Sequence, residues 1–331
     1  ILIGGVLASL MILSLPSIDV ISSALGFEAI LGVAILVALT LDLSINVSFN
    51  PTRSIIADVT PDGVDRTRGY TWMQTISGSF GVLAYGIGGY FDNYTLIYFG
   101  AILVFLFSVI PPFFIEEPRD LHASEDDDAG SQTADVTSLS LPQIILTIRP
   151  LWGFFIYAVY GMTLRLSEIE VDHYYVEYAC LAVTLFLVGE ALFKKDDAEG
   201  LSIADKSRIG FQKVLAANSF NWIGVQTMFI YNIAFLQQKI PSLTDAELGS
   251  INSWGFFFLS LISAILPAFV LEPVARKIGQ TTTQWICMAI MAVGYLGILF
   301  FGTSAIAMYI LMCIVGIGWG ATVSLPFAIM S

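Results

Sequence analysis

The chain has 331 residues, of which 56% are hydrophobic and only 12% are charged, and its mean hydropathy is +0.79. Soluble domains carry about 25% charged residues, so this composition excludes an ordinary soluble protein and indicates a polytopic membrane protein. Much of the net charge of −13 comes from one acidic stretch between residues 116 and 135, and the 14 Lys and Arg residues are spread too thinly to form a nucleic-acid-binding surface.

Apolar runs long enough to cross about 30 Å of hydrocarbon recur along the whole chain. They lie at about 1–16, 27–50, 69–91, 95–115, 144–166, 175–193, 211–238, 248–271, 281–301 and 304–330. A lipid-exposed backbone must satisfy its own hydrogen bonds, and the runs lack the alternation of a barrel, so each is predicted to be a helix. The predicted fold class is an all-α polytopic membrane protein.

Both ends of the sequence fall beside apolar runs. The first run opens at Ile1 without an initiator Met, and Ser331 follows directly on the last run. We therefore expect a fragment that is truncated at both ends and carries no signal peptide.

Positive residues gather on one side of the predicted bundle. If the loop between the second and third spans lies inside, the outside keeps only Arg165 and Lys239. The inside segments then collect Arg53, Arg66, Arg68, Arg119, Arg149, Lys194, Lys195, Lys206, Arg208, Lys213, Arg276 and Lys277. Cytoplasmic loops carry an excess of Lys and Arg, so this alternation predicts the orientation and supports the count of ten spans.

The segment 116–143 between the fourth and fifth spans is polar and acidic, and its composition predicts a disordered linker. An alternative is a calcium loop at Asp126–Gly130, but the cluster lacks the alternating ligands and the final Glu of an EF-hand. The three cysteines lie inside apolar runs, and the chain has only two histidines. We therefore expect no disulfide, no metal site and no cofactor.

Asp42 is a carboxylate in the middle of the second span. It lies about 21 Å along the helix from Glu28 and about 16 Å from Arg53, which are the interfacial charges on either side. A lone carboxylate in hydrocarbon costs roughly 2.5–3.5 kcal/mol on insertion scales, so Asp42 is expected to face the bundle interior. It is then either a carboxylate that couples a proton or ion to transport, or an interhelical hydrogen-bonding group.

Asn46 and Asn50 follow Asp42 at successive turns, so the three side chains share one helix face. A carboxylate and two amides in a row suit a ligand rich in hydroxyl groups. The alternative is hydrogen bonding between helices.

Two other spans carry polar groups where lipid is expected. Gln74 lies in the third span beside Gly78 and Gly81, which favour close packing. The seventh span contributes the three residues Trp222, Gln226 and Asn232. These amides and the indole are candidate substrate contacts, or they pack between helices.

The last span contains Gly316-Ile317-Gly318-Trp319-Gly320, a spacing that predicts tight helix packing. Pro326 is expected to break or bend this helix.

The stretch from Leu41 to Asp58 fits the pattern L-D-x(3)-N-x(4)-P-x-R-x(3)-A-D. It resembles the fourth helix of the sucrose:proton symporters, which belong to the glycoside–pentoside–hexuronide cation symporters of the major facilitator superfamily. Three further stretches agree in order and extend the resemblance over most of the chain. They are Arg66-Thr67-Arg68, Asn221-Trp222-Ile223, and Gly316-Ile317 through Ser324-Leu325-Pro326-Phe327-Ala328.

The resemblance implies a major facilitator-type helical bundle of two halves. The N-terminal half would be 1–115 with helices three to six, followed by the acidic cytoplasmic linker 116–143. A transmembrane hairpin inserted at 144–195 would precede the C-terminal half, 196–331, with helices seven to ten. The resemblance also implies proton coupling at Asp42 and substrate binding at Asn46. It implies gating roles for five residues at the cytoplasmic side: Arg53, Asp58, Arg68, Arg276 and Lys277.

We therefore expect a secondary active transporter that carries a sugar or glycoside with H⁺, or with Na⁺, across the cell membrane. Its partners would be this substrate, the coupling cation and the lipid bilayer, with no nucleic acid, and it would act as a monomer. The alternatives are a carrier of another small solute on the same fold and a non-transporting receptor or scaffold. We expect no enzyme, because no nucleophile–base pair or metal triad is present.

Overall fold

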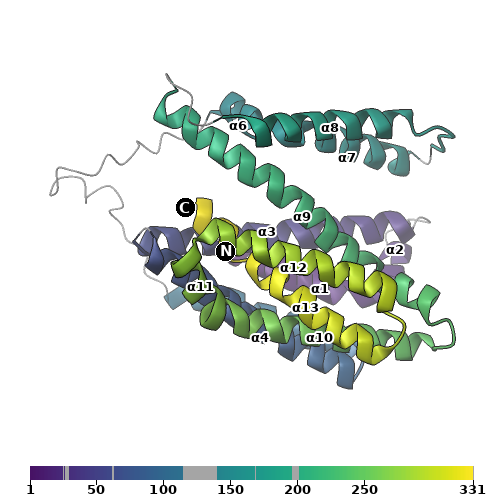
Figure 1. The fold of residues 1–331 in the computed structure, drawn as a ribbon. Coiled ribbons are helices and arrows are strands. Elements are labelled where there is room, and N and C mark those ends of the chain that lie inside the picture. The colour runs from purple at the N-terminus through teal and green to yellow at the C-terminus, as the bar shows by residue number, and fades with distance from the viewer. Residues whose placement is uncertain are drawn as a thin grey trace. The chain divides into compact units, whose positions relative to one another are not determined.

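The computed structural model describes residues 1–24, 26, 30–61, 63–114, 140–167, 169–195 and 201–330. Within these residues every regular element is helical, which confirms the predicted all-α class. The α-helices are α1 (Leu2–Ser14), α2 (Ile18–Ala24), α3 (Ile30–Val59), α4 (Val64–Tyr90), α5 (Asn93–Val109), α6 (Leu141–Thr147), α7 (Trp152–Leu166), α8 (Tyr175–Phe193), α9 (Ile203–Lys239), α10 (Asp245–Leu266), α11 (Glu272–Ile278), α12 (Gln280–Phe301), α13 (Ala305–Thr322) and α14 (Leu325–Met330) (Figure 1). Three short 3₁₀-helices, η1 (Leu15–Ser17), η2 (Pro111–Phe114) and η3 (Arg149–Leu151), and one π-helical segment, η4 (Pro267–Leu271), adjoin them.

Seven stretches of the described chain are long and apolar enough to cross a membrane, and the bent pair of α6 with η3 and α7 is an eighth if it counts as one span. The seven are Leu2–Ala24, Ile30–Ala57, Tyr94–Phe114, Tyr175–Phe193, Asp245–Ile278, Gln280–Phe301 and Ala305–Met330. The other two predicted spans are also helices, α4 and α9, of 27 and 37 residues. Both are long enough to cross a membrane, but polar residues such as Gln74 and Asn232 lower their hydropathy.

The described structure separates into two compact units, Ile1–Pro112 with Phe220–Ser331, and Phe113–Ser219. The predicted boundaries at 115, 143 and 195 stay a prediction. The structural units differ from them because the hairpin packs on the first turns of α9. The predicted acidic linker lies mostly outside the described residues, which resume at Ser140.

In the first unit α10 lies at the centre, with α4 along one side and α13 along the other, and α12 packs on α13 (Figure 1). The buried core here includes Phe256 and Leu259 of α10 and Met312 of α13. In the same unit α1 packs between α3 and α5. The exposed carboxyl of Asp92 caps α5, and hydrogen bonds from Thr95 hold the pKa of that carboxyl below its usual range.

Glycines allow two of these helix pairs to approach closely. A Cβ at Gly78 would lie 2.8 Å from the Cα of Ala264, where α4 crosses α10. A Cβ at Gly316 would lie 2.6 Å from the carbonyl oxygen of Leu259, where α13 crosses α10. Real Cβ atoms do not come this close to other atoms, so the predicted packing roles of Gly78 and Gly316 are confirmed.

The break predicted at Pro326 is also confirmed. Helix α13 ends at Thr322, and α14 begins at Leu325 after a turn. Proline cannot donate a backbone hydrogen bond and clashes with the preceding helical turn. The helix therefore restarts in α14, which packs against α4 and α12.

The second unit holds the predicted hairpin, whose first arm is bent. The predicted span 144–166 is not one straight helix, because α6 and the helix that begins at Arg149 meet at 63°. In an unbroken helix, the amide of residue 150 would donate to the carbonyl of Leu146. Pro150 has no amide hydrogen, and the amide of Leu151 donates to Ile148 instead of Thr147.

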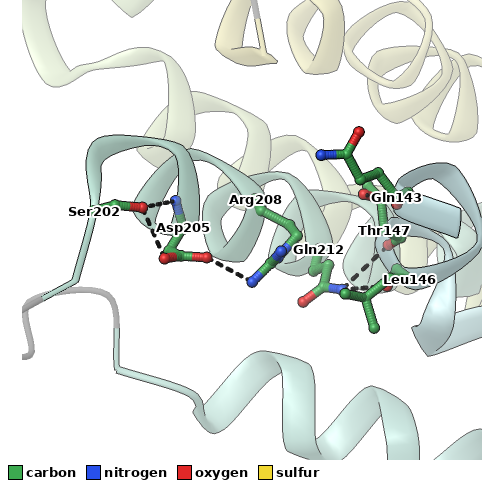
Figure 2. A network of polar contacts seen from close by, with 7 residues as sticks. All are labelled: Gln143, Leu146, Thr147, Ser202, Asp205, Arg208 and Gln212. Atoms are coloured by element: carbon green, nitrogen blue, oxygen red, sulfur yellow. Dashed lines mark hydrogen bonds and ion pairs between the residues drawn. The ribbon is translucent and has the colours of Figure 1, made fainter. Parts of the chain in front are cut away.

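Gln212 of α9 donates to the two carbonyls that lose their usual helical donors at the bend. Its Nε2 donates to the carbonyl oxygen of Leu146 at 3.0 Å and to that of Thr147 at 3.3 Å (Figure 2). The Gln212 side chain is buried. Nearby, Arg149 pairs with Glu190 of α8 at 2.7 Å. The Gln212 bonds fix the bent arm of the hairpin to the first turns of α9, and the ion pair joins the bend to α8.

A polar stripe on helix α3 and its aromatic end

Asp42, Asn46 and Asn50 lie on α3 as the periodicity predicts, and all three side chains are exposed in the described structure. Asp42 lies about 18 Å from the start of the candidate span at Ile30 and about 22 Å from its end at Ala57. The Nδ2 of Asn46 donates to the main-chain oxygen of Asp42 at 2.9 Å. Within the described residues, no hydrogen bond to the Asp42 carboxylate is found.

The other face of α3 packs on α1. Val33, Val37 and Ser44 are buried there, and a Cβ at Gly4 of α1 would lie 2.6 Å from the carbonyl oxygen of Ser44. Ser44 is two residues after Asp42, about 200° around the helix. The face with Asp42, Asn46 and Asn50, here called the polar stripe, therefore points away from α1.

Arg53 lies just beyond Asn50, at the C-terminal end of the polar stripe, and its contacts identify the neighbouring helix there. It follows Asp42 by three helical turns on the same face. The Cζ of Arg53 lies 3.7 Å from the ring centroid of Phe49 and 4.1 Å from that of Phe327 in α14. The face that carries Asp42 and Asn46 therefore turns, at Arg53, toward α14.

The predicted residues of α9 fall into two environments. Asn232 is buried, and its Nδ2 donates to Oδ1 of Asn252 in α10 at 2.7 Å. Trp222 is half-buried and meets Trp319 of α13 edge to face, with 5.7 Å between ring centroids. Gln226 is exposed. Asn232 thus takes part in packing between α9 and α10, whereas the Gln226 side chain makes no hydrogen bond within the described residues.

Sequence reasoning missed a ladder of aromatic rings around Trp222. Phe229 of α9 stacks on Phe256 of α10 with 5.0 Å between centroids and an interplanar angle of 6°. Phe256 also stacks on Tyr85 of α4, and Phe229 meets the edge of Trp319. The rings come from four different helices, α4, α9, α10 and α13, so no pattern within one helix could reveal these contacts.

Gln74 is buried on α4. It precedes Gly78 by one turn and shares its face, which packs on α10 and η4. No hydrogen bond between Gln74 and the polar residues of α3 is found within the described residues.

The predicted gating residues are spread over one end of the first unit. Arg68 and Lys277 are exposed, and Arg276 forms an ion pair with Glu272 one turn earlier. Asp58 lies on α3, but its side chain is outside the described part of the structure.

A cavity of about 230 Å³ opens beside Arg276, between the start of α4 and the junction of α11 with α12. The Nε2 of Gln280 donates to Oγ1 of Thr67 at its edge, which ties α4 to α12. In the described part of the chain, no group of three or more His, Cys, Asp or Glu side chains lies close enough to hold a metal ion.

The arrangement offers a carboxylate and two amides on one face of α3, an exposed amide on α9, and aromatic rings on α4, α9, α10 and α13. Groups of these kinds can bind a small polar ligand through hydrogen bonds and ring contacts. Of the predicted residues, the structure groups Asp42, Asn46, Asn50 and Arg53 on one face. It leaves the α9 residues and the arginines of α4 and α11 elsewhere in the same unit.

The whole chain was compared with known proteins. The family model of the Major Facilitator Superfamily matches residues 1–331. No curated protein and no solved structure shows a significant match to the chain. The match over the full length agrees with the helical fold and the apolar spans. The chain belongs to the Major Facilitator Superfamily and is a multi-pass membrane transporter.

Proposed function

We propose that this transporter carries a sugar or glycoside across the cell membrane by proton-coupled symport, with Asp42 as the proton-coupling residue. The observation that carries the proposal is the polar stripe on α3, which places Asp42, Asn46 and Asn50 on one exposed face near the middle of a span. A carboxylate facing lipid would be costly, so a transport pathway is the environment in which this stripe is stable.

The direction in which the polar stripe points also supports a transport pathway beside α3. It points away from α1, and at Arg53 it reaches the ring of Phe327 in α14. Substrate sites of secondary transporters lie near the bilayer midplane between repeats that rock against each other. In this site Asn46 and Asn50 would offer amide groups to sugar hydroxyls. Trp222 and Gln226 of α9 are the candidate contacts from the predicted C-terminal half.

The closeness of Asn46 to Asp42 suggests how proton and sugar are coupled. Asn46 already uses one amide hydrogen on the main chain of Asp42, so its position depends on the same helical turn. A change of charge on Asp42 alters the field at the Asn46 amide, which lies one turn away. Protonation of Asp42 would thereby change the affinity for a ligand held by Asn46.

Counterflow in liposomes tests the proposal. The full-length protein is reconstituted and loaded with unlabelled sugar, and the entry of trace radiolabelled sugar is followed over a panel of mono- and disaccharides and glucosides. We expect transient accumulation of at least one member. Counterflow of other small solutes alone would favour a different carrier, and no counterflow of any solute would favour the receptor or scaffold alternative.

A further inference from the structure

One cation and three aromatic rings form a cluster between α3, α4 and α14, and we name Phe49, Arg53, Tyr70 and Phe327 the latch cluster. The Arg53 guanidinium lies between two rings, 3.7 Å from the centroid of Phe49 and 4.1 Å from that of Phe327. Tyr70 of α4 stacks on Phe327 with 5.8 Å between centroids and an interplanar angle of 30°. Phe49 and Arg53 are neighbours on α3, but Phe327 lies more than 250 residues away in the sequence.

Local structure holds each member of the latch cluster in place. Tyr70 is only 3% exposed, and its hydroxyl donates to the main-chain oxygen of Arg53 at 3.3 Å. Phe327 reaches the cluster because the chain breaks before Pro326 and restarts as α14, and the residues at this restart, Ser324 and Leu325, are fully buried. Phe327 is therefore presented by a fixed backbone.

Two aromatic rings contact the cation of the latch cluster. In the described part of the chain, no carboxylate forms an ion pair with Arg53. A guanidinium over an aromatic face is attracted by the ring quadrupole. When such a contact opens, only the guanidinium has to be solvated, because the ring is neutral, whereas a broken buried ion pair leaves two charges to be solvated. This chemistry suits a contact that opens and closes repeatedly.

The latch cluster lies at the end of α3 that the distribution of Lys and Arg predicts to be cytoplasmic. It joins the predicted N-terminal half, through α3 and α4, to the predicted C-terminal half, through α14. It also lies on the same face as Asp42, three turns further along α3. We propose that the latch cluster closes the cytoplasmic end of the transport pathway, and that Phe327 is the positioning residue that holds Arg53 in the closed state.

The proposal rests on the proposed transport function, but its test measures opening directly. Spin labels are placed at Ser54 of α3 and Met330 of α14, both exposed, after Cys180, Cys287 and Cys313 are replaced. Double electron–electron resonance then gives the distance distribution between the two labels in nanodiscs. A longer distance reports separation of α14 from α3.

Three variants separate ring chemistry from packing. Phe327→Leu keeps an apolar side chain but removes the ring face, and we expect the ratio of open to closed populations to rise about two- to thirtyfold, the range for loss of one cation–π contact. Phe327→Tyr keeps a ring face and should retain the closed population. Phe301→Leu, at an exposed ring on α12, is the matched control and should change nothing.

A fourth variant tests the partnership of Arg53 and Phe327. Arg53→Gln should open the pair as Phe327→Leu does, and combining the two should add little, because both remove the same contact. An unchanged distance distribution in Phe327→Leu, or equal opening in Phe327→Leu and Phe327→Tyr, would overturn the latch.

Failure of the latch proposal can be distinguished from failure of the proposed sugar transport. If the native protein shows no sugar counterflow but Phe327→Leu opens, the latch stands and the sugar assignment fails. If sugar counterflow is present and Phe327→Leu does not open, the latch alone fails.

Discussion

Replacing Gln212 with leucine should loosen the bent arm of the hairpin. Gln212 is buried and donates to the carbonyl oxygens of Leu146 and Thr147 at 3.0 and 3.3 Å. The bend at Pro150 leaves these carbonyls without their usual helical donors. Leucine fills nearly the same volume, so the cavity contribution is small. The loss comes from the unsatisfied acceptors, which cost about 1–3 kcal/mol when buried.

Apolar burial of the new leucine offsets part of this cost, so we expect a net loss of about 1–2 kcal/mol in docking of the hairpin on α9. That corresponds to a 5- to 30-fold larger undocked population, to an order of magnitude. Hydrogen exchange followed by mass spectrometry measures this undocked population locally, because undocking exposes the amides of residues 141–151. Their exchange should accelerate by about the same factor.

Gln237→Leu is the matched control. Gln237 lies on the same helix but is exposed, so the exchange of residues 141–151 should stay as in the native protein. If Gln212→Leu leaves that exchange unchanged as well, Gln212 does not fix the hairpin, and the explanation of the bend is wrong.

Three further predictions concern packing and topology. Gly78→Ala should destabilise the protein by about 1–3 kcal/mol through overpacking against α10, whereas Gly100→Ala on α5, where a Cβ meets open space, should not. Thermal unfolding in detergent compares the two variants, and equal melting temperatures would contradict the close approach of α4 to α10. Alanine at Asn232, at Asn252 and at both should give a coupling energy of about 0.5–3 kcal/mol in a double-mutant cycle, and strict additivity would mean that their hydrogen bond contributes nothing. A cysteine at Glu170 should react with an impermeant thiol reagent added outside; labelling only after permeabilisation would reverse the predicted orientation of the hairpin.

Features that depend on one helix could be predicted from the sequence. The spacing of Asp42, Asn46 and Asn50 puts them on one face of any helix, and Pro326 lacks the backbone donor that would continue α13 without a break. The small residues Gly78 and Gly316 predict that another helix packs closely on theirs, but not which helix it is. These predictions held because they depend on backbone geometry alone.

Features that depend on helices far apart in the sequence could not be predicted. Phe49 precedes Arg53 by four residues, a spacing that signals a contact, but nothing near Phe327 indicates that it meets the same guanidinium. The apolar run around Pro150 predicts a straight span, because hydropathy averages over the break. Asn232 looks like a ligand contact in sequence, yet its hydrogen bond to Asn252 depends on how α9 meets α10.

Asp42→Asn tests the proton-coupled transport proposal most directly. The asparagine keeps the shape of the side chain and mimics the protonated carboxyl, so it removes only the ability to carry a proton. Gradient-driven accumulation of the sugar found by counterflow is compared with exchange at equal concentrations in the same liposomes. Asp92→Asn is the control, since it makes the same change at an exposed helix cap, where asparagine caps equally well.

We predict that Asp42→Asn abolishes accumulation and retains exchange, because exchange needs no net movement of protons, while Asp92→Asn keeps both. Accumulation by Asp42→Asn at the native level would contradict the coupling role of Asp42.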